Sequence, residues 1–191
     1  RLVTRLRCAR CRSLPYPLEP ARSRGIGRKS TPMKRGDLLF LDTNIFLSAT
    51  DASRAEHASC RNILERAIAA GLHPVISGQV VREYLVVATR PVANNGLGLR
   101  PSTALDNVSE FQTCAHLLPE SVEVTRHLLA LIKSANLSGK RIHDANIAAV
   151  MIIHGVTTIA TANIDDYAGL PGVTSGTPTD TLFAIDALMA G

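Results

Sequence analysis

Acidic side chains interrupt three apolar stretches of this sequence. Asp42 directly follows the apolar run 38–41, Glu83 shares a helical face with valines, and Asp144 lies in the first turn of another apolar helical stretch. A carboxylate among apolar residues is costly unless a positive group satisfies it. Carboxylate oxygens without Cys or His ligands suit a hard cation, Mg²⁺ or Mn²⁺. A pocket of this kind can activate water for attack on a phosphodiester.

A fourth segment, 161–167, adds further oxygen ligands directly after a β-branched run. Asn163 and Asp166 are well placed to contribute an oxygen to the same site, whereas Asp165 is interpreted as a solvated loop acid. Each acid also has a purely structural interpretation. Asp42 or Asn44 can cap a helix, the helix dipole favours an acid in a first turn, and a glutamate can lie at the rim of an apolar stripe.

Hydrophobic periodicity predicts short strands that alternate with helices. Such a pattern indicates an α/β domain with a parallel sheet covered on both faces, and ligands bind such sheets at the carboxyl ends of the strands. All four segments therefore map to one edge of one sheet. The predicted strands are 38–41, 74–77, 117–118 and 157–161; the predicted helices are 56–70, 78–89, 102–114, 122–135 and 142–154, with a loop at 91–101.

Composition and charge divide the chain into two parts. The 191 residues fit one domain, and a hydrophobic content of 46% excludes a disordered chain. Residues 1–36 carry eleven basic residues and one acid, whereas residues 37–191 carry ten basic residues and fifteen acids. We interpret 1–36 as a disordered basic extension, with Met33 as the natural start; a basic nucleic-acid-binding arm is the alternative.

The remaining composition narrows the function classes. Aromatic residues make up only 4% of the chain, which argues against a stacking platform for single-stranded nucleic acid. No apolar run approaches the ~18 residues of a membrane span. Cys8 and Cys11 form a CxxC pair, but no second pair follows at zinc-finger spacing. Cys60 and Cys114 are expected to be small buried hydrophobes, and four cysteines without a disulfide framework fit a reducing cytoplasm.

Four motifs in order resemble the PIN domain of VapC-type toxins from bacterial type II toxin–antitoxin systems. The resemblance covers about residues 37–175, and we assign 37–191 to a PIN domain. It implies a three-layer α/β/α fold with a short central parallel sheet. The motifs are Leu41-Asp42-Thr43-Asn44-Ile45-Phe46, Gln79 to Leu85, His143 to Ala149, and Thr161-Ala162-Asn163 with Asp166-Tyr167; the segment Gly169 to Val173 resembles the tail of these proteins.

The resemblance also implies roles for individual residues. Asp42, Glu83, Asp144 and Asp166 would be the catalytic acids, with Mg²⁺ (or Mn²⁺ in its place) held by Asp42 and Asp144, together with Glu83. The residues that shape the metal site around them would be Asn44, Thr161 and Asn163. Glu83 or Asp166 would orient the attacking water, and the products would carry a 5′-phosphate and a 3′-hydroxyl.

The implied function is a Mg²⁺-dependent endoribonuclease that acts as a toxin in the bacterial cytoplasm. Its expected partners are a structured RNA, a cognate antitoxin that places a peptide across the acidic pocket, and a second copy of the chain. Two alternatives are a PIN nuclease of RNA processing or decay and a non-catalytic PIN-like interaction module. The acidic balance of 37–191 argues against a broad basic face, so RNA would be guided by local cations: Arg82, Arg90, Arg100, Lys140 and Arg141.

Overall fold

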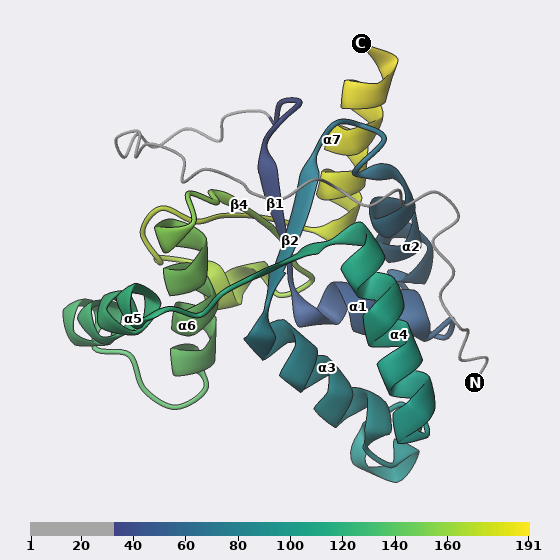
Figure 1. Ribbon diagram of the computed structural model, residues 1–191, viewed down its shortest axis with the longest axis horizontal. Coiled ribbons are helices and arrows are strands. Elements are labelled where there is room, and N and C mark those ends of the chain that lie inside the picture. Colours follow the sequence, from purple (N-terminus) through teal and green to yellow (C-terminus); the bar gives the residue numbers. More distant parts are fainter. Residues whose placement is uncertain (1–32) are drawn as a thin grey trace.

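Five short parallel strands form one sheet at the centre of the computed structural model, which describes residues 33–191 (Figure 1). The spatial order is β3-β2-β1-β4-β5, and every neighbouring pair is parallel. The strands are β1 (Leu38–Leu41), β2 (His73–Ser77), β3 (His116–Leu118), β4 (Thr158–Ala160) and β5 (Thr174–Gly176). The predicted α/β class with a short parallel sheet is confirmed.

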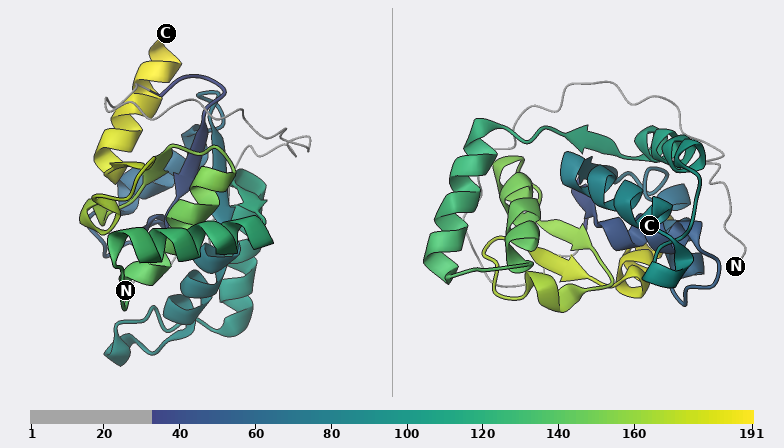
Figure 2. Two further views of the ribbon diagram at one scale, coloured as in Figure 1. Left: turned by 90° about the vertical axis from the view of Figure 1, so that its left-hand side faces the viewer. Right: turned by 90° about the horizontal axis from the view of Figure 1, so that it is seen from below.

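Helices flank the sheet on both faces and complete three layers. Figures 1 and 2 place α5 and α6 on one side and α1, α2 and α7 on the other, while α3 and α4 extend beyond the strand ends. The helices are α1 (Thr43–Thr50), α2 (His57–Arg66), α3 (Gly78–Thr89), α4 (Pro101–Cys114), α5 (Val122–Ala135), α6 (Arg141–Ile153) and α7 (Pro178–Ala190), with 3₁₀ turns η1 (Val92–Asn94) and η2 (Ile164–Tyr167).

The core lies between the sheet and its two helical layers. Residues 39–41 of β1 are completely buried, as expected for a central strand covered on both faces. Ala145, Ala148 and Ala149 are also completely buried, so their small side chains let α6 pack closely on the sheet. This packing holds the first turn of α6 near the strand ends. Within the described residues, no helix combines the length and apolar character required to cross a membrane.

The carboxyl ends of β1 and β4 lie side by side at the centre of the sheet. The chain leaves β1 toward β2 and β3 on one side, and β4 and β5 pair on the other. Leu41 pairs with Ala160, and the Asp42 amide donates to the Ala160 carbonyl at 3.1 Å. Asp42 and Thr161, the residues that follow these two strands, are thereby neighbours. Ligands bind open α/β sheets at such a switch in strand order.

Some element boundaries differ from the sequence prediction. The α-helix predicted for 56–70 ends at Arg66 and continues as turns, and the loop at 91–101 contains η1. Neither β5 nor α7 was predicted. The CxxC pair, Cys8 and Cys11, and most of the proposed basic extension lie outside the described residues, so the domain boundary at residue 36 stays a prediction. Cys60 and Cys114 are buried free thiols, as expected.

Candidate functional site

Asp42 is held in place by three hydrogen-bond donors at the start of α1. It is the N-cap of that helix and is 7% exposed. Its Oδ1 accepts the backbone N–H of Thr43 at 2.7 Å. Its Oδ2 accepts the amide of Asn44 at 2.7 Å and the hydroxyl of Thr161 at 2.6 Å. The capping interpretation of Asp42 is therefore correct, but it uses only part of the accepting capacity of the carboxylate.

Glu83 is oriented by one donor at each carboxylate oxygen. The hydroxyl of Thr43 donates to Oε2 at 2.8 Å, and the amide of Gln79 donates to Oε1 at 2.7 Å. Thr43 follows Asp42 directly, so α1 and α3 are joined at the two acids. Glu83 is half-buried and faces into the molecule from the middle of α3.

One cavity of about 850 Å³ brings the predicted site residues together at the carboxyl edge of the sheet. Glu83 lines it from α3, Asp144 from the first turn of α6, and Asp166 from η2. Thr161 is fully buried beneath it and reaches it through Asp42. The cavity is lined by Asp42, Thr43, Asn44, Leu47, Gln79, Arg82, Glu83, Val86, Val87, Arg90, Leu128, Lys140, Ile142, His143, Asp144, Asn146, Asn163 and Asp166.

Burial and mutual repulsion raise the pKa values of two acids in this cavity. Desolvation raises the pKa of Asp42 to about 6; the charge of Glu83 adds to this effect, while the hydrogen bonds to the carboxylate oppose it. Desolvation and, after it, the nearby charges of Asp166, Asp42 and Glu83 together raise the pKa of Asp144 to about 6, while the charge of His143 opposes the rise. Burial and the same four carboxylates raise the pKa of Tyr167, which stays protonated. The acids therefore act on one another electrostatically.

Three of the five cations proposed to guide RNA line this cavity. They are Arg82, Arg90 and Lys140, whereas Arg100 and Arg141 are not among the lining residues. The guanidinium of Arg82 is already paired with Glu120 at 3.3 Å. Within residues 33–191, no lysine, arginine or histidine forms an ion pair with any of the four acids.

The donor set fits a hard cation bound partly through water. In the described part of the chain, His, Cys, Asp and Glu side chains do not gather in threes closely enough to enclose an ion. Mg²⁺ does not need such a cage, because it usually keeps several waters and binds through one or two carboxylates. Acids whose charges raise the pKa values of Asp42 and Asp144, and that form no ion pair with a basic side chain of the described residues, are the expected setting for such an ion.

The structure also adds residues to which sequence reasoning gave no role. Thr43 donates to Glu83, and the side chain of Gln79 links Glu83 to α6. Asn146 donates to Gln79 from the second turn of α6. One signal was available in the sequence: Gln79 precedes Glu83 by four residues and therefore shares its helical face.

Comparisons with a family model and with solved structures both match most of the described chain. A family model described as the PIN domain matches residues 39–169. Among solved structures, VapBC2 from Rickettsia felis, bound to a DNA fragment from its promoter, has a TM-score of 0.57 at 19% identity and covers 73% of this chain and 98% of its own. DNA-bound VapBC from Salmonella typhimurium gives 0.53 at 18%, with coverage of 74% and 98%.

A third solved structure is named as a toxin. VapC20 from Mycobacterium tuberculosis, described as a sarcin-ricin loop cleaving toxin, has a TM-score of 0.51 at 17% identity and covers 69% of this chain and 95% of its own. At these identities the likeness concerns the fold. No curated protein matches the chain significantly.

Proposed function

This chain belongs to the PIN domain family, whose members are nucleases, and we propose that it is a Mg²⁺-dependent endoribonuclease that acts as the toxin of a toxin–antitoxin pair. One observation carries the proposal. Four acids from four separate segments, Asp42, Glu83, Asp144 and Asp166, line one cavity at the carboxyl edge of the sheet and form no ion pair with a basic side chain among residues 33–191. The fold shared with VapC toxins supports the toxin role.

Asp42 and Asp144 would hold the ion, and Glu83 would complete its surroundings. When bound, the cation would place positive charge beside a phosphoryl oxygen and lower the pKa of a water molecule that it holds. Glu83, fixed by Thr43 and Gln79, keeps a defined orientation toward the cavity. Asp166 is exposed on η2 and is the acid most open to solvent, so it is suited to accept a proton from the attacking water.

The rest of the cavity lining suits an RNA substrate. Arg90 directly follows α3, Lys140 directly precedes α6, and both line the cavity together with apolar side chains. Cations of this kind contact the phosphates, which position a nucleic acid without reading its sequence. In the bacterial cytoplasm, a cognate antitoxin would occupy the same acidic cavity with a basic side chain, and a second copy of the chain would form a homodimer.

Removal of the metal is the direct test of this activity. The purified chain is expected to cut a structured, 5′-labelled RNA in Mg²⁺ or Mn²⁺ and to stop when EDTA is added, because the acids alone cannot neutralise the charge that develops on phosphate. Product ends are read by ligation and sequencing. Cutting that continues at full rate in EDTA, or no cutting in either metal, would overturn the proposal. Growth arrest on induction, with cleaved cellular RNA, would separate a toxin from a processing enzyme.

Replacement of Glu83 by glutamine is expected to weaken Mn²⁺ binding about tenfold, because one charge is lost while both hydrogen bonds remain possible. Gln at 83 can accept from Gln79 and donate to the Thr43 hydroxyl, so its orientation is kept. Titration calorimetry measures the affinity. Glu123→Gln, which changes an exposed glutamate on α5, is the matched control. An unchanged affinity in Glu83→Gln would remove Glu83 from the metal site.

A further inference from the structure

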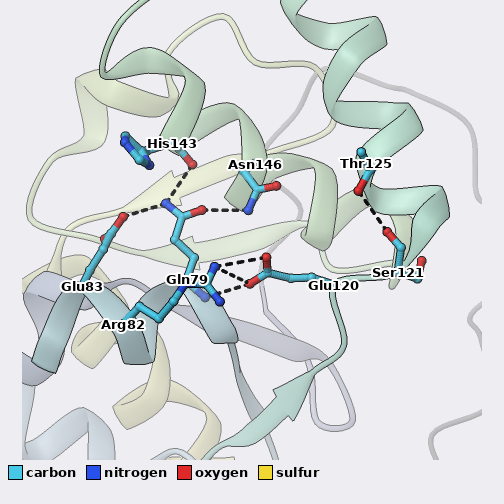
Figure 3. A network of polar contacts seen from close by, with 8 residues as sticks. All are labelled: Gln79, Arg82, Glu83, Glu120, Ser121, Thr125, His143 and Asn146. Carbon is cyan, nitrogen blue, oxygen red and sulfur yellow. Dashed lines mark hydrogen bonds and ion pairs between the residues drawn. The ribbon is translucent and has the colours of Figure 1, made fainter.

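The side chain of Gln79 lies buried between the two helices that carry Glu83 and Asp144. It is 5% exposed and occupies the first turn of α3 (Figure 3). Its Nε2 donates to Glu83 Oε1 at 2.7 Å and to the His143 carbonyl at 3.1 Å. Its Oε1 accepts the amide of Asn146 at 2.8 Å. One side chain thus joins α3 to the first two turns of α6.

These contacts fix the orientation of the Gln79 amide. Its two N–H groups face two acceptors, a carboxylate oxygen and a carbonyl, while its oxygen faces a donor. Rotation of the amide by 180° would set oxygen against both acceptors and nitrogen against the Asn146 amide. Every polar contact would then become repulsive, so the amide has one satisfied orientation. A glutamate has the same shape but cannot satisfy these contacts when ionised.

The backbone of Gln79 is fixed at the same point. Ser77 occupies the N-cap position of α3 but makes no capping bond, and its hydroxyl has no hydrogen-bond partner in the described part of the chain. Glu120 replaces it: its Oε1 accepts the Gln79 backbone N–H at 2.8 Å and also contacts Arg82. A carboxylate at this place is favoured by the helix dipole. Figure 3 shows the contacts of the Gln79 side chain together with the contact between its backbone and Glu120.

Gln79 links Glu83 and Asp144, two acids that share no hydrogen bond with each other. Gln79 holds one oxygen of Glu83, and the same amide group holds the backbone of His143, which directly precedes Asp144. One amide therefore links Glu83 on α3 to the backbone next to Asp144 on α6, where it bears on the spacing of the two acids. A divalent ion bound between acids depends on this spacing, and groups that orient its ligands affect its binding.

We propose that Gln79 is a positioning residue of this site: its amide, oriented by Asn146, sets Glu83 and Asp144 at the spacing that binds the divalent cation. This inference rests on the proposed function. Gln79 does not touch the ion or the scissile phosphate in this scheme. It acts through the two acids, so its loss changes metal binding and turnover and does not change contacts with RNA.

Gln79→Met keeps the length of the side chain and removes its three hydrogen bonds. Titration calorimetry with Mn²⁺ is expected to show an affinity 10–100-fold lower, the range seen when groups that orient metal ligands are lost. Under saturating RNA, kcat is expected to fall while KM stays within about twofold. Gln112→Met changes an exposed glutamine on α4 in the same way and is the matched control. Wild-type affinity and kcat in a folded Gln79→Met variant would overturn the inference.

A second variant covers the case in which Gln79→Met does not fold. Asn146→Ala leaves Gln79 in place and removes only the donor that orients its amide, at a half-buried position. A smaller fall in Mn²⁺ affinity is expected, and an unchanged affinity would overturn the inference. Wild-type protein that binds no Mn²⁺ and cuts no RNA would overturn the proposed function and the inference together. Normal wild-type binding with no effect of either variant would overturn the inference alone.

Discussion

Asp42→Asn is expected to lower RNA cleavage by about a thousandfold or more, because the substitution removes the charge at the centre of the acidic cavity. Asp42 lies at the end of the central strand β1, and its charge acts on Asp144 and is itself affected by Glu83. An asparagine oxygen is a weaker ligand for Mg²⁺ than a carboxylate and does not balance the charge of the ion. Single-turnover cleavage of a labelled RNA measures the loss.

The same substitution is expected to leave the fold intact. The Asn oxygen can take the place of Oδ2 and still accept the Asn44 amide and the Thr161 hydroxyl. One contact, with the Thr43 N–H, then becomes unfavourable because the new amide nitrogen faces it. Against this, the raised pKa of Asp42 means that its ionised form is disfavoured in the folded state, so a neutral residue removes a cost at pH 7. We therefore expect a melting temperature close to that of the wild type.

A charge change at the other end of β1 is the matched control. Asp37 is exposed, accepts the Lys34 N–H at 2.8 Å, and is not among the residues that line the cavity. Asp37→Asn should cut RNA at the wild-type rate. If Asp42→Asn lost activity only together with its circular-dichroism signal, Asp42 would be a structural residue and the proposed role would be wrong.

The part of the site on the strand ends could be predicted from local sequence. A buried strand followed by an acid places that acid at the carboxyl edge, which is why Asp42 and Thr161 were assigned correctly to one place. Asp144 was placed by the alanines that follow it, because small residues on one face predict close packing. These inferences need only the spacing of apolar and small residues along the sequence and the parallel arrangement of the strands.

The contacts between helices could not be predicted in the same way. Gln79 meets His143 and Asn146 from more than sixty residues away in the sequence, and their approach depends on how α3 and α6 pack. No spacing of residues within either helix indicates how the two helices lie against each other. The same limit explains Arg100 and Arg141, whose charge suggested a role but whose position lies off the cavity lining. β5 has only three residues, and α7 exposes Phe183, so neither gave a clear pattern.

The affinity for Mn²⁺ is expected to fall by about a hundredfold between pH 7.5 and pH 5 and to change little above pH 7, because up to two protons compete with the ion at the lower pH. Asp42 and Asp144 both have a pKa raised to about 6. Below that pH each acid must release a proton before it can bind a cation. Ordinary aspartates would show this competition about two pH units lower. Calorimetry at pH 7.5, 6 and 5 measures the profile.

The stability of the metal-free chain should show the opposite pH dependence. The two pKa values are higher in the folded state than in the unfolded chain, whose reference value is 3.8. Between pH 4 and 6 the folded state therefore binds more protons, and this contribution to stability is lost as pH rises through about 6. Mn²⁺ should restore it, so the ion should raise the melting temperature at pH 7.5 and not at pH 5.

His143 is the group that must be separated from these acids, because it lines the cavity, precedes Asp144 and lowers the pKa of that acid. His143→Gln removes its imidazole and keeps the backbone carbonyl that Gln79 uses. We expect the pH profile of Mn²⁺ binding to persist in this variant, since the two aspartates produce it. A profile that disappears in His143→Gln would assign the titration to the imidazole, and equal affinity at pH 5 and 7.5 in the wild type would show that the acids are not the ligands.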